Sequence, residues 1–182
     1  RLAVTCSYDR TAAIWDVKTG RRLHVLPSDQ PVMVARFSPD GTRIATAGFD
    51  NLARIWDTAS GTLLRTLTGH TGGIWFVSFS SDGKKLLTGS DDMTARVWNA
   101  ETGELISLLQ GHGQALSAAQ FSPDGQQVVT TAAPRITTEI PMEVWDKVLP
   151  AAPLADSSAA NLAVICTGGV VPWGNPDGFK TY

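Results

Sequence analysis

His70, Thr88, Asp92 and Trp98 are the residues of this chain whose types and spacing most suggest chemistry. An imidazole placed between a carboxylate and a hydroxyl can activate a nucleophile, because it takes the hydroxyl proton while the carboxylate orients the ring. The same groups can instead form an internal network in which every buried polar atom finds a hydrogen-bond partner. The distribution of these residue types along the rest of the chain distinguishes the two interpretations.

These residue types recur with a nearly constant period. The dipeptides Trp-Asp or Trp-Asn occur four times, at intervals of 41, 42 and 47 residues. The recurring positions are Trp15, Trp56, Trp98 and Trp145 for the indole, Thr5, Thr46, Thr88 and Thr130 for the hydroxyl, and Asp9, Asp50 and Asp92 for the carboxylate. A period of this length indicates one supersecondary unit repeated along the chain. Because a catalytic set would not be copied in every unit, the pattern favours a structural network.

The repeated unit reads as four short strands joined by turns. In the third copy, apolar and β-branched runs cover residues 73–79, 85–90, 94–98 and 104–109. Asp82-Gly83, Asp91-Asp92 and Thr102-Gly103 separate them, and such residues form tight turns readily. No stretch keeps apolar residues at helical spacing for three turns, so the sequence predicts an all-β protein.

In the order and register of these landmarks, the chain resembles the WD-repeat β-propeller family over residues 1 to about 146. The matching landmarks are Gly69-His70 and Gly111-His112, Ser38-Pro39-Asp40-Gly41 and Ser122-Pro123-Asp124-Gly125, the Asp of each turn before Thr, and the Trp-Asp pairs. The resemblance implies four-stranded antiparallel blades around a central channel. It also implies a non-catalytic role as a platform for partners.

Laid onto the chain, the resemblance gives about four blades. They cover residues 1–26, which lack an innermost strand, then 32–67, 73–109 and 115–149, the last made irregular by a protruding loop at about 132–141. Propellers close with about four to eight blades, and WD-repeat rings usually need more residues than the 182 present. We therefore expect a partial propeller, either a fragment of a longer protein or one half of a homodimer that completes a ring.

The resemblance assigns a role to each member of the network. The carboxylate holds the imidazole, the imidazole reaches the hydroxyl, and the hydroxyl reaches the indole N–H. The expected members are His70, Thr88, Asp92 and Trp98 in the third blade, Thr46, Asp50 and Trp56 in the second, Thr5, Asp9 and Trp15 in the first, and His112, Thr130 and Trp145 in the fourth. The set is complete only in the third blade, since Ser28 takes the histidine position of the second and the fourth lacks the Asp.

The resemblance also points to a partner-binding face, formed by positions near the start of each first strand and before each turn Asp. We take Tyr8, Met33, Phe49, Trp75 and Asp91 as its candidate residues. Trp75 stands where a polar residue is common, so an exposed aromatic patch is expected there. The alternative is that Trp75 packs against neighbours in its own blade.

Composition excludes several functional classes. The net charge is −2, and lysine and arginine cluster no further than adjacent pairs, so no nucleic-acid partner is expected. No apolar run approaches 18 residues, so no membrane span is predicted. The three histidines are far apart in sequence, and neither a metal site nor a cofactor is expected. Cys6 lies in a predicted strand as a small core residue, which suits a reducing cytoplasm.

Residues 150–182 follow the repeats. A linker rich in Pro, Ala and Ser precedes the apolar run Leu162–Cys166, which could return as a strand that closes an open blade edge. The leading functional hypothesis is a scaffold for protein–protein interaction, part of or derived from a larger multidomain protein. The alternative is an enzyme with a propeller body and a site in the channel or the C-terminal tail.

Overall fold

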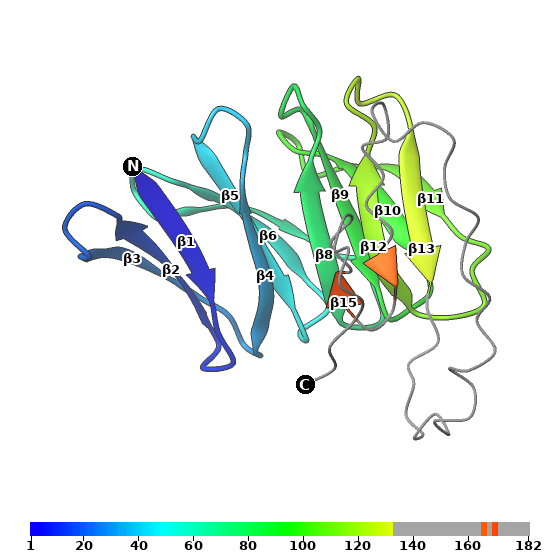
Figure 1. The fold of residues 1–182 in the computed structure, drawn as a ribbon, viewed down its shortest axis with the longest axis horizontal. Helices are drawn as coiled ribbons and strands as arrows, with labels where there is room; N and C mark the ends of the chain where they lie inside the picture. The colour runs from blue at the N-terminus through cyan, green and yellow to red at the C-terminus, as the bar shows by residue number, and fades with distance from the viewer. Residues whose placement is uncertain (133–164, 167–168, 171–182) are drawn as a thin grey trace, which may run out of the picture. The chain divides into compact units, whose positions relative to one another are not determined.

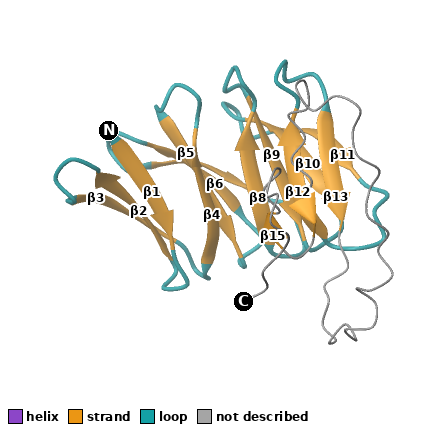
Figure 2. Cartoon of the chain, in the orientation of Figure 1, coloured by secondary structure: helices purple, strands orange, loops and turns teal. Residues whose placement is uncertain are grey.

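The structure, a computed structural model, describes residues 1–132, 165–166 and 169–170 (Figure 1). Every regular element among these residues is a strand, and none is a helix (Figure 2). The predicted all-β class is therefore confirmed. The chain divides into a compact unit over Arg1–Arg135, which holds the blades, and a second unit over Ile136–Tyr182.

Four antiparallel sheets follow one another along the first unit. The first is a three-stranded sheet of β1 (Leu2–Cys6), β2 (Thr11–Asp16) and β3 (Arg22–Pro27). The second contains β4 (Val32–Phe37), β5 (Arg43–Gly48), β6 (Ala53–Asp57) and β7 (Leu63–Leu67). The third contains β8 (Ile74–Phe79), β9 (Lys85–Ser90), β10 (Ala95–Asn99) and β11 (Leu105–Leu109). The fourth pairs β12 (Leu116–Phe121) with β13 (Val128–Ala132). Each sheet is one blade of an open, partial propeller.

The turns form where the sequence supplies the chemistry that they need. Between β8 and β9, Ser80 Oγ donates to Asp82 Oδ1 at 2.7 Å, and the backbone N–H of Lys84 donates to the same oxygen at 3.0 Å. Gly83 closes this turn with a φ of 69°, a left-handed conformation that only glycine adopts without strain. Equivalent bonds form at Asp40 and Asp124, so one turn design sets the register of three blades.

Apolar side chains fill the spaces between successive sheets. Ile14 and Leu26 pack with Ile44 and Trp56 between the first two blades, and all four are almost fully buried. Two further clusters join the second blade to the third and the third to the fourth. A single blade cannot bury both of its faces, so each sheet depends on its neighbours for its core.

Hydrogen bonds from side chains to backbone carbonyl groups join adjacent blades. The Arg43 guanidinium of β5 donates to Gly83 O at 2.7 Å in the next blade. On the outer strands, Arg65 Nε donates to Glu101 O at 2.8 Å, and His24 Nε2 donates to Ala59 O at 2.9 Å in the equivalent place one blade earlier. These contacts fix the position of each blade against the next.

The first blade ends on the inner side at β1, which is the edge strand of its sheet. The N–H of Ser7 donates to Thr11 O, and the N–H of Val17 donates to Arg1 O. The backbone N–H and C=O groups of the odd-numbered residues of β1 therefore point toward β2. Because peptide groups alternate in direction along an antiparallel strand, Leu2, Val4 and Cys6 direct their backbone groups toward the open edge.

The open edge overturns one expectation from the sequence. Cys6 was expected in the core, but its side chain is exposed. Ala47 and Gly89, which occupy the same place in β5 and β9, are buried: Ala47 packs in one cluster with Ile74 and Val77, and the side chains of Leu116, Ala119 and Phe76 surround Gly89. In the first blade no strand of the described residues covers β1 on that side.

In the second unit, the described residues form two short strands, β14 (Ile165–Cys166) and β15 (Gly169–Val170), which pair antiparallel with each other. The end of the apolar run Leu162–Cys166 is thus a strand. Its role in closing a blade edge stays a prediction. The protruding loop, Trp145 and the outer half of the fourth blade lie outside the described residues.

Candidate functional site

The third blade brings His70, Thr88, Asp92 and Trp98 into one chain of hydrogen bonds. His70 Nδ1 lies 2.7 Å from Asp92 Oδ2, and His70 Nε2 lies 2.7 Å from Thr88 Oγ1. Trp98 Nε1 donates to Thr88 Oγ1 at 2.9 Å. With the imidazole proton on Nδ1, every donor meets one acceptor, because Thr88 accepts from the indole and donates to Nε2.

Burial and hydrogen bonding set the charge states in this network. Burial lowers the pKa of His70 below the ordinary value of 6.5 for a histidine, although the Asp92 carboxylate opposes this effect. For Asp92, burial raises the pKa, but hydrogen bonds from Thr94, His70 and the Thr71 backbone outweigh it and bring the pKa down to about 2. A neutral imidazole beside an ionised carboxylate agrees with the direction of the hydrogen bonds.

The second blade also pairs the carboxylate of its turn with hydrogen-bond donors, but it uses different residues. Ser28, at the histidine position, donates to Asp50 Oδ2 at 2.9 Å, and Arg54 Nη1 donates to the same carboxylate oxygen at 2.5 Å. The Arg54 side chain is almost fully buried. Trp56 Nε1 still donates to Thr46 Oγ1 at 2.8 Å. No sequence pattern distinguished Arg54, because the third blade carries Arg96 at the same position and retains its histidine.

The remaining two blades keep only parts of the network. In the first, Trp15 Nε1 donates to Thr5 Oγ1 at 2.8 Å, while Asp9 accepts hydrogen bonds from Thr11 in its own turn. In the fourth, His112 Nε2 lies 2.8 Å from Thr130 Oγ1. Trp145, the expected indole of the fourth blade, lies outside the described residues.

The geometry argues against nucleophilic catalysis at Thr88. Its side chain is completely buried, with 0% of its surface exposed, so a substrate cannot reach its hydroxyl. The hydroxyl also accepts a hydrogen bond from Trp98 Nε1 within the buried network. The arrangement can therefore hold strands in register, and it offers no reacting atom to solvent.

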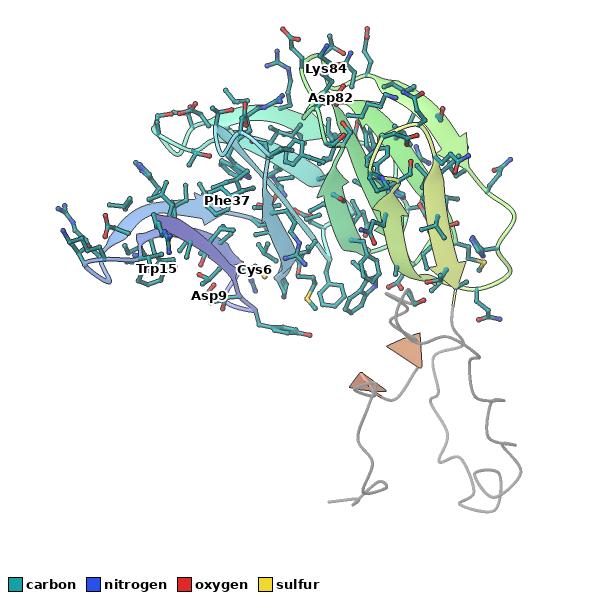
Figure 3. The ribbon with its side chains drawn as sticks, turned by 45° about the horizontal axis from the view of Figure 1, so that its top comes forward. Cys6, Asp9, Trp15, Phe37, Asp82 and Lys84 are labelled. Carbon is teal, nitrogen blue, oxygen red and sulfur yellow. The ribbon has the colours of Figure 1, made fainter. Side chains whose placement is uncertain are left out.

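The candidate binding residues lie at the end of the blades that carries the β1–β2, β5–β6 and β9–β10 turns. Figure 3 shows Asp9 of the first of these turns at the opposite end of the strands from Asp82 and Lys84. Tyr8 is 68% exposed and Phe49 is 37% exposed. Their ring centroids lie 6.3 Å apart, although they belong to different blades. An aromatic row thus crosses the blade boundary.

Trp75 of β8 continues this row but is less exposed than the sequence suggested. Its ring meets Phe49 edge-on, with centroids 5.3 Å apart and planes at 86°. Trp75 is half-buried because Phe49 of the preceding blade leans over it. We name Tyr8, Phe49 and Trp75 the aromatic row.

Phe49 can lean over Trp75 because Gly73 has no side chain. A Cβ atom at Gly73 would lie 3.0 Å from Phe49 Cδ1 and 3.6 Å from Asp91 Oδ2. The ring and the carboxylate therefore flank one glycine. Met33, the fifth candidate, borders a groove of about 500 Å³ that runs past Cys6, Met33–Arg36, Trp75–Ser78 and Ala118–Gln120.

The described residues contain no group of three or more His, Cys, Asp and Glu side chains placed to hold a metal ion. Nor do they include a helix with the length and apolar character needed to cross a membrane.

Comparison with known proteins gives two different results along the chain. A family model described as WD domain, G-beta repeat matches residues 20–57, 61–99 and 103–133, together more than half of the sequence. A second model, described as glycine/sarcosine/betaine reductase selenoprotein B, matches residues 130–182. The two matches overlap at the end of the described part of the fourth blade.

Several curated proteins share a short segment with the chain. The glycine reductase complex component B subunit gamma of Symbiobacterium thermophilum is 51% identical over 41 residues, which are 22% of this chain and 10% of that protein. The protein of the same name from Carboxydothermus hydrogenoformans is 49% identical over 41 residues, 22% of this chain and 9% of its own. The betaine reductase complex component B subunit beta of Peptoclostridium acidaminophilum is 52% identical over 40 residues, with the same shares. The chain spans about a tenth of the length of these relatives.

Proposed function

This chain belongs to the WD-repeat family, and from that premise we propose that it is a non-catalytic scaffold whose loop face binds a protein or peptide partner. The observation that carries the proposal is the aromatic row. Tyr8 and Phe49 expose large rings to solvent, and Phe49 rests on the half-buried Trp75. Met33 and Asp91 complete the proposed face.

The chemistry of the row suits partner binding. Exposed aromatic residues supply most of the binding energy in many interfaces, because they bury a large area at little cost in side-chain entropy. Trp75 lies on strand β8, and Phe49, in the β5–β6 turn, packs against its ring, so these two rings would lose little order on binding. The buried networks of the blades support the proposal indirectly, since we assign them the structural role of keeping the loops in place.

Selection of peptides by display on the purified chain tests this proposal. Peptides that use the face should bind Phe49→Ala at least about tenfold more weakly than the parent, as expected for an aromatic hot spot. Val17→Ala is the matched control, because Val17 is 56% exposed in the β2–β3 turn at the other end of the blades. If both variants bind the selected peptides as the parent does, the aromatic row is not the partner site.

Self-association forms a second part of the proposal. The backbone groups of Leu2, Val4 and Cys6 face the open edge of β1, and an unpaired edge invites a strand from another chain. Two copies of about four blades would make a ring of about eight, within the range of known propellers. Light scattering over a range of concentrations should show a dimer. A constant monomeric mass, with the amides of Leu2, Val4 and Cys6 protected from hydrogen exchange, would contradict it.

The alternative is an enzymatic contribution from the tail. It is favoured by the reductase family match over residues 130–182, a range that contains Cys166. Under this alternative, the purified chain would consume glycine, sarcosine or betaine in the presence of a dithiol, and Cys166→Ser would abolish that turnover. Absence of turnover in the unmodified chain would leave the scaffold proposal as the better account.

Two further aspects of the proposal concern context. We propose that the blades act as part of, or derive from, a larger multidomain protein, because two different family models match residues 20–133 and 130–182. We also propose a cytoplasmic location, where thiols such as Cys6 stay reduced. Fractionation of cells that make the protein, with thiol labelling of Cys6, tests the second point.

A further inference from the structure

Resting on the proposed binding face, we infer that the partner segment continues from this face into the groove along the inner strands, where it binds as an acidic peptide whose carboxylate is held by Arg36. Met33 and Trp75, two of the proposed binding residues, line this groove, so the face and the groove are continuous. The groove measures about 500 Å³, within the range of about 300–1,000 Å³ that is usual for ligand sites. It therefore has room for a few residues of an extended chain.

The inner strands of three blades present their side chains to the groove at matching levels. β4, β8 and β12 lie side by side (Figure 1), and each pairs with the next strand of its blade in the same register. One level is polar and consists of Arg36, Ser78 and Gln120. The next level, on the side of the aromatic row, is apolar and consists of Val34, Phe76 and Ala118. A peptide in the groove would thus meet hydrogen-bonding groups beside an apolar surface.

Arg36 gives the groove its charge. Among the described residues that line the groove, Arg36 is the only charged one, and its side chain is exposed. Its Nη1 atom donates to the neighbouring Ala35 O at 3.3 Å, and no carboxylate of the described residues forms an ion pair with it. The other N–H groups of the guanidinium can therefore donate to a carboxylate of the ligand, the partner that a guanidinium binds most strongly.

The charges at the two ends of the groove orient an acidic peptide. Near Arg36, the turns that follow the inner strands carry three aspartates and three cations, which balance: Asp40, Asp82, Asp124, Arg43, Lys84 and Lys85. Arg36 makes this end positive. At the other end, the loops and adjoining strand residues carry five aspartates and three arginines, namely Asp9, Asp29, Asp50, Asp91, Asp92, Arg10, Arg54 and Arg96. A carboxylate is therefore favoured at Arg36 and disfavoured near the loops.

Selection from a random peptide display library on the purified chain tests the inference. The selected sequences should contain Asp or Glu beside an apolar residue. Exchange of that acid for its amide, or Arg36→Gln in the chain, should each weaken binding about tenfold, as measured by fluorescence anisotropy of the labelled peptide. The two changes together should weaken binding no more than either alone, because they remove the two partners of one contact.

Arg21→Gln is the matched control, since it removes one exposed arginine from the β2–β3 turn of the first blade. Gln120→Glu should also weaken the selected peptides, because it adds a carboxylate to the polar level of the groove. Thermal unfolding of each variant shows that it is folded.

Equal binding of the acid and amide peptides, or additive effects of the amide exchange and Arg36→Gln, would overturn the inference. If Phe49→Ala still weakened those peptides, the scaffold proposal would stand without it. Peptides that depend on Arg36 but not on Phe49 would support the groove and contradict the aromatic row as the partner site. If the library yields no binding peptide, both proposals fail.

Discussion

Replacement of threonine by valine at the network position of three blades tests whether burial determines how much these hydrogen bonds contribute to stability. The substitution keeps the β-branched shape and replaces the hydroxyl with a methyl group. Thr88 and Thr46 are 0% and 4% exposed, whereas Thr5 is exposed in the edge blade. One chemical change is thus placed in three environments of a single molecule.

The expected loss of stability for each variant follows from the hydrogen-bonding groups that the substitution leaves unpaired. Thr88→Val leaves Trp98 Nε1 and His70 Nε2 unpaired, and each buried orphan costs about 1–3 kcal/mol. The added methyl group returns up to about 0.8 kcal/mol, so a net loss of about 1–6 kcal/mol is expected. Thr46→Val leaves only Trp56 Nε1 unpaired and should cost about half as much. Thr5→Val should cost less than about 0.5 kcal/mol, because water can replace the lost partner.

Urea unfolding, followed by tryptophan fluorescence and by circular dichroism, measures the three losses. Comparison of the two probes and of the m-values shows whether the blades unfold together, as the comparison of free energies requires. Thr66→Val on the exposed strand β7 gives the baseline effect of the substitution. Losses equal within error for Thr88→Val, Thr46→Val and Thr5→Val would refute the argument from burial.

Three further predictions follow from the same contacts. The pKa of His70 is lowered in the folded state, so the unfolded chain binds protons more readily and the free energy of unfolding should fall as pH drops below about 6.5. The pKa of Asp92 is lowered to about 2, which adds a further loss of stability between pH 3.8 and about 2. Equilibrium unfolding across pH measures both windows, and His70→Gln should reduce the upper one. Met93 is exposed and has a φ of 66°, so Met93→Gly should stabilise the protein by about 0.5–1 kcal/mol and raise its melting temperature. Asn51→Gly should raise the melting temperature less, because asparagine tolerates this conformation. Arg54→Met should destabilise the protein by about 3–5 kcal/mol, because it leaves Asp50 buried without its cation. Adding Asp50→Asn should recover much of that loss in urea unfolding. If the double variant lost the sum of the two single losses, the coupling of Arg54 to Asp50 would be contradicted.

The sequence by itself determined the repeated unit. The period of Trp15, Trp56 and Trp98 located three blades, and the Asp-Gly turns located the ends of their strands. This succeeds because strand alternation and turn conformation are local properties, set by residues a few positions apart. The pairing of Thr88 with Trp98 follows from the same cause, since antiparallel neighbours in a hairpin have a fixed register.

Only the tertiary structure decided what lies between blades or at their edges. Both the second and third blades carry an arginine at the same position, but Asp50 bonds to Arg54 whereas Asp92 bonds to His70, and only the structure shows this difference. Trp75 is half-buried because Phe49 comes from another blade and passes over Gly73. Cys6 is exposed because its strand is an edge, although its sequence matches that of covered strands. Burial depends on neighbours that are distant in sequence, so a pattern of residue types can indicate a face without showing what covers it.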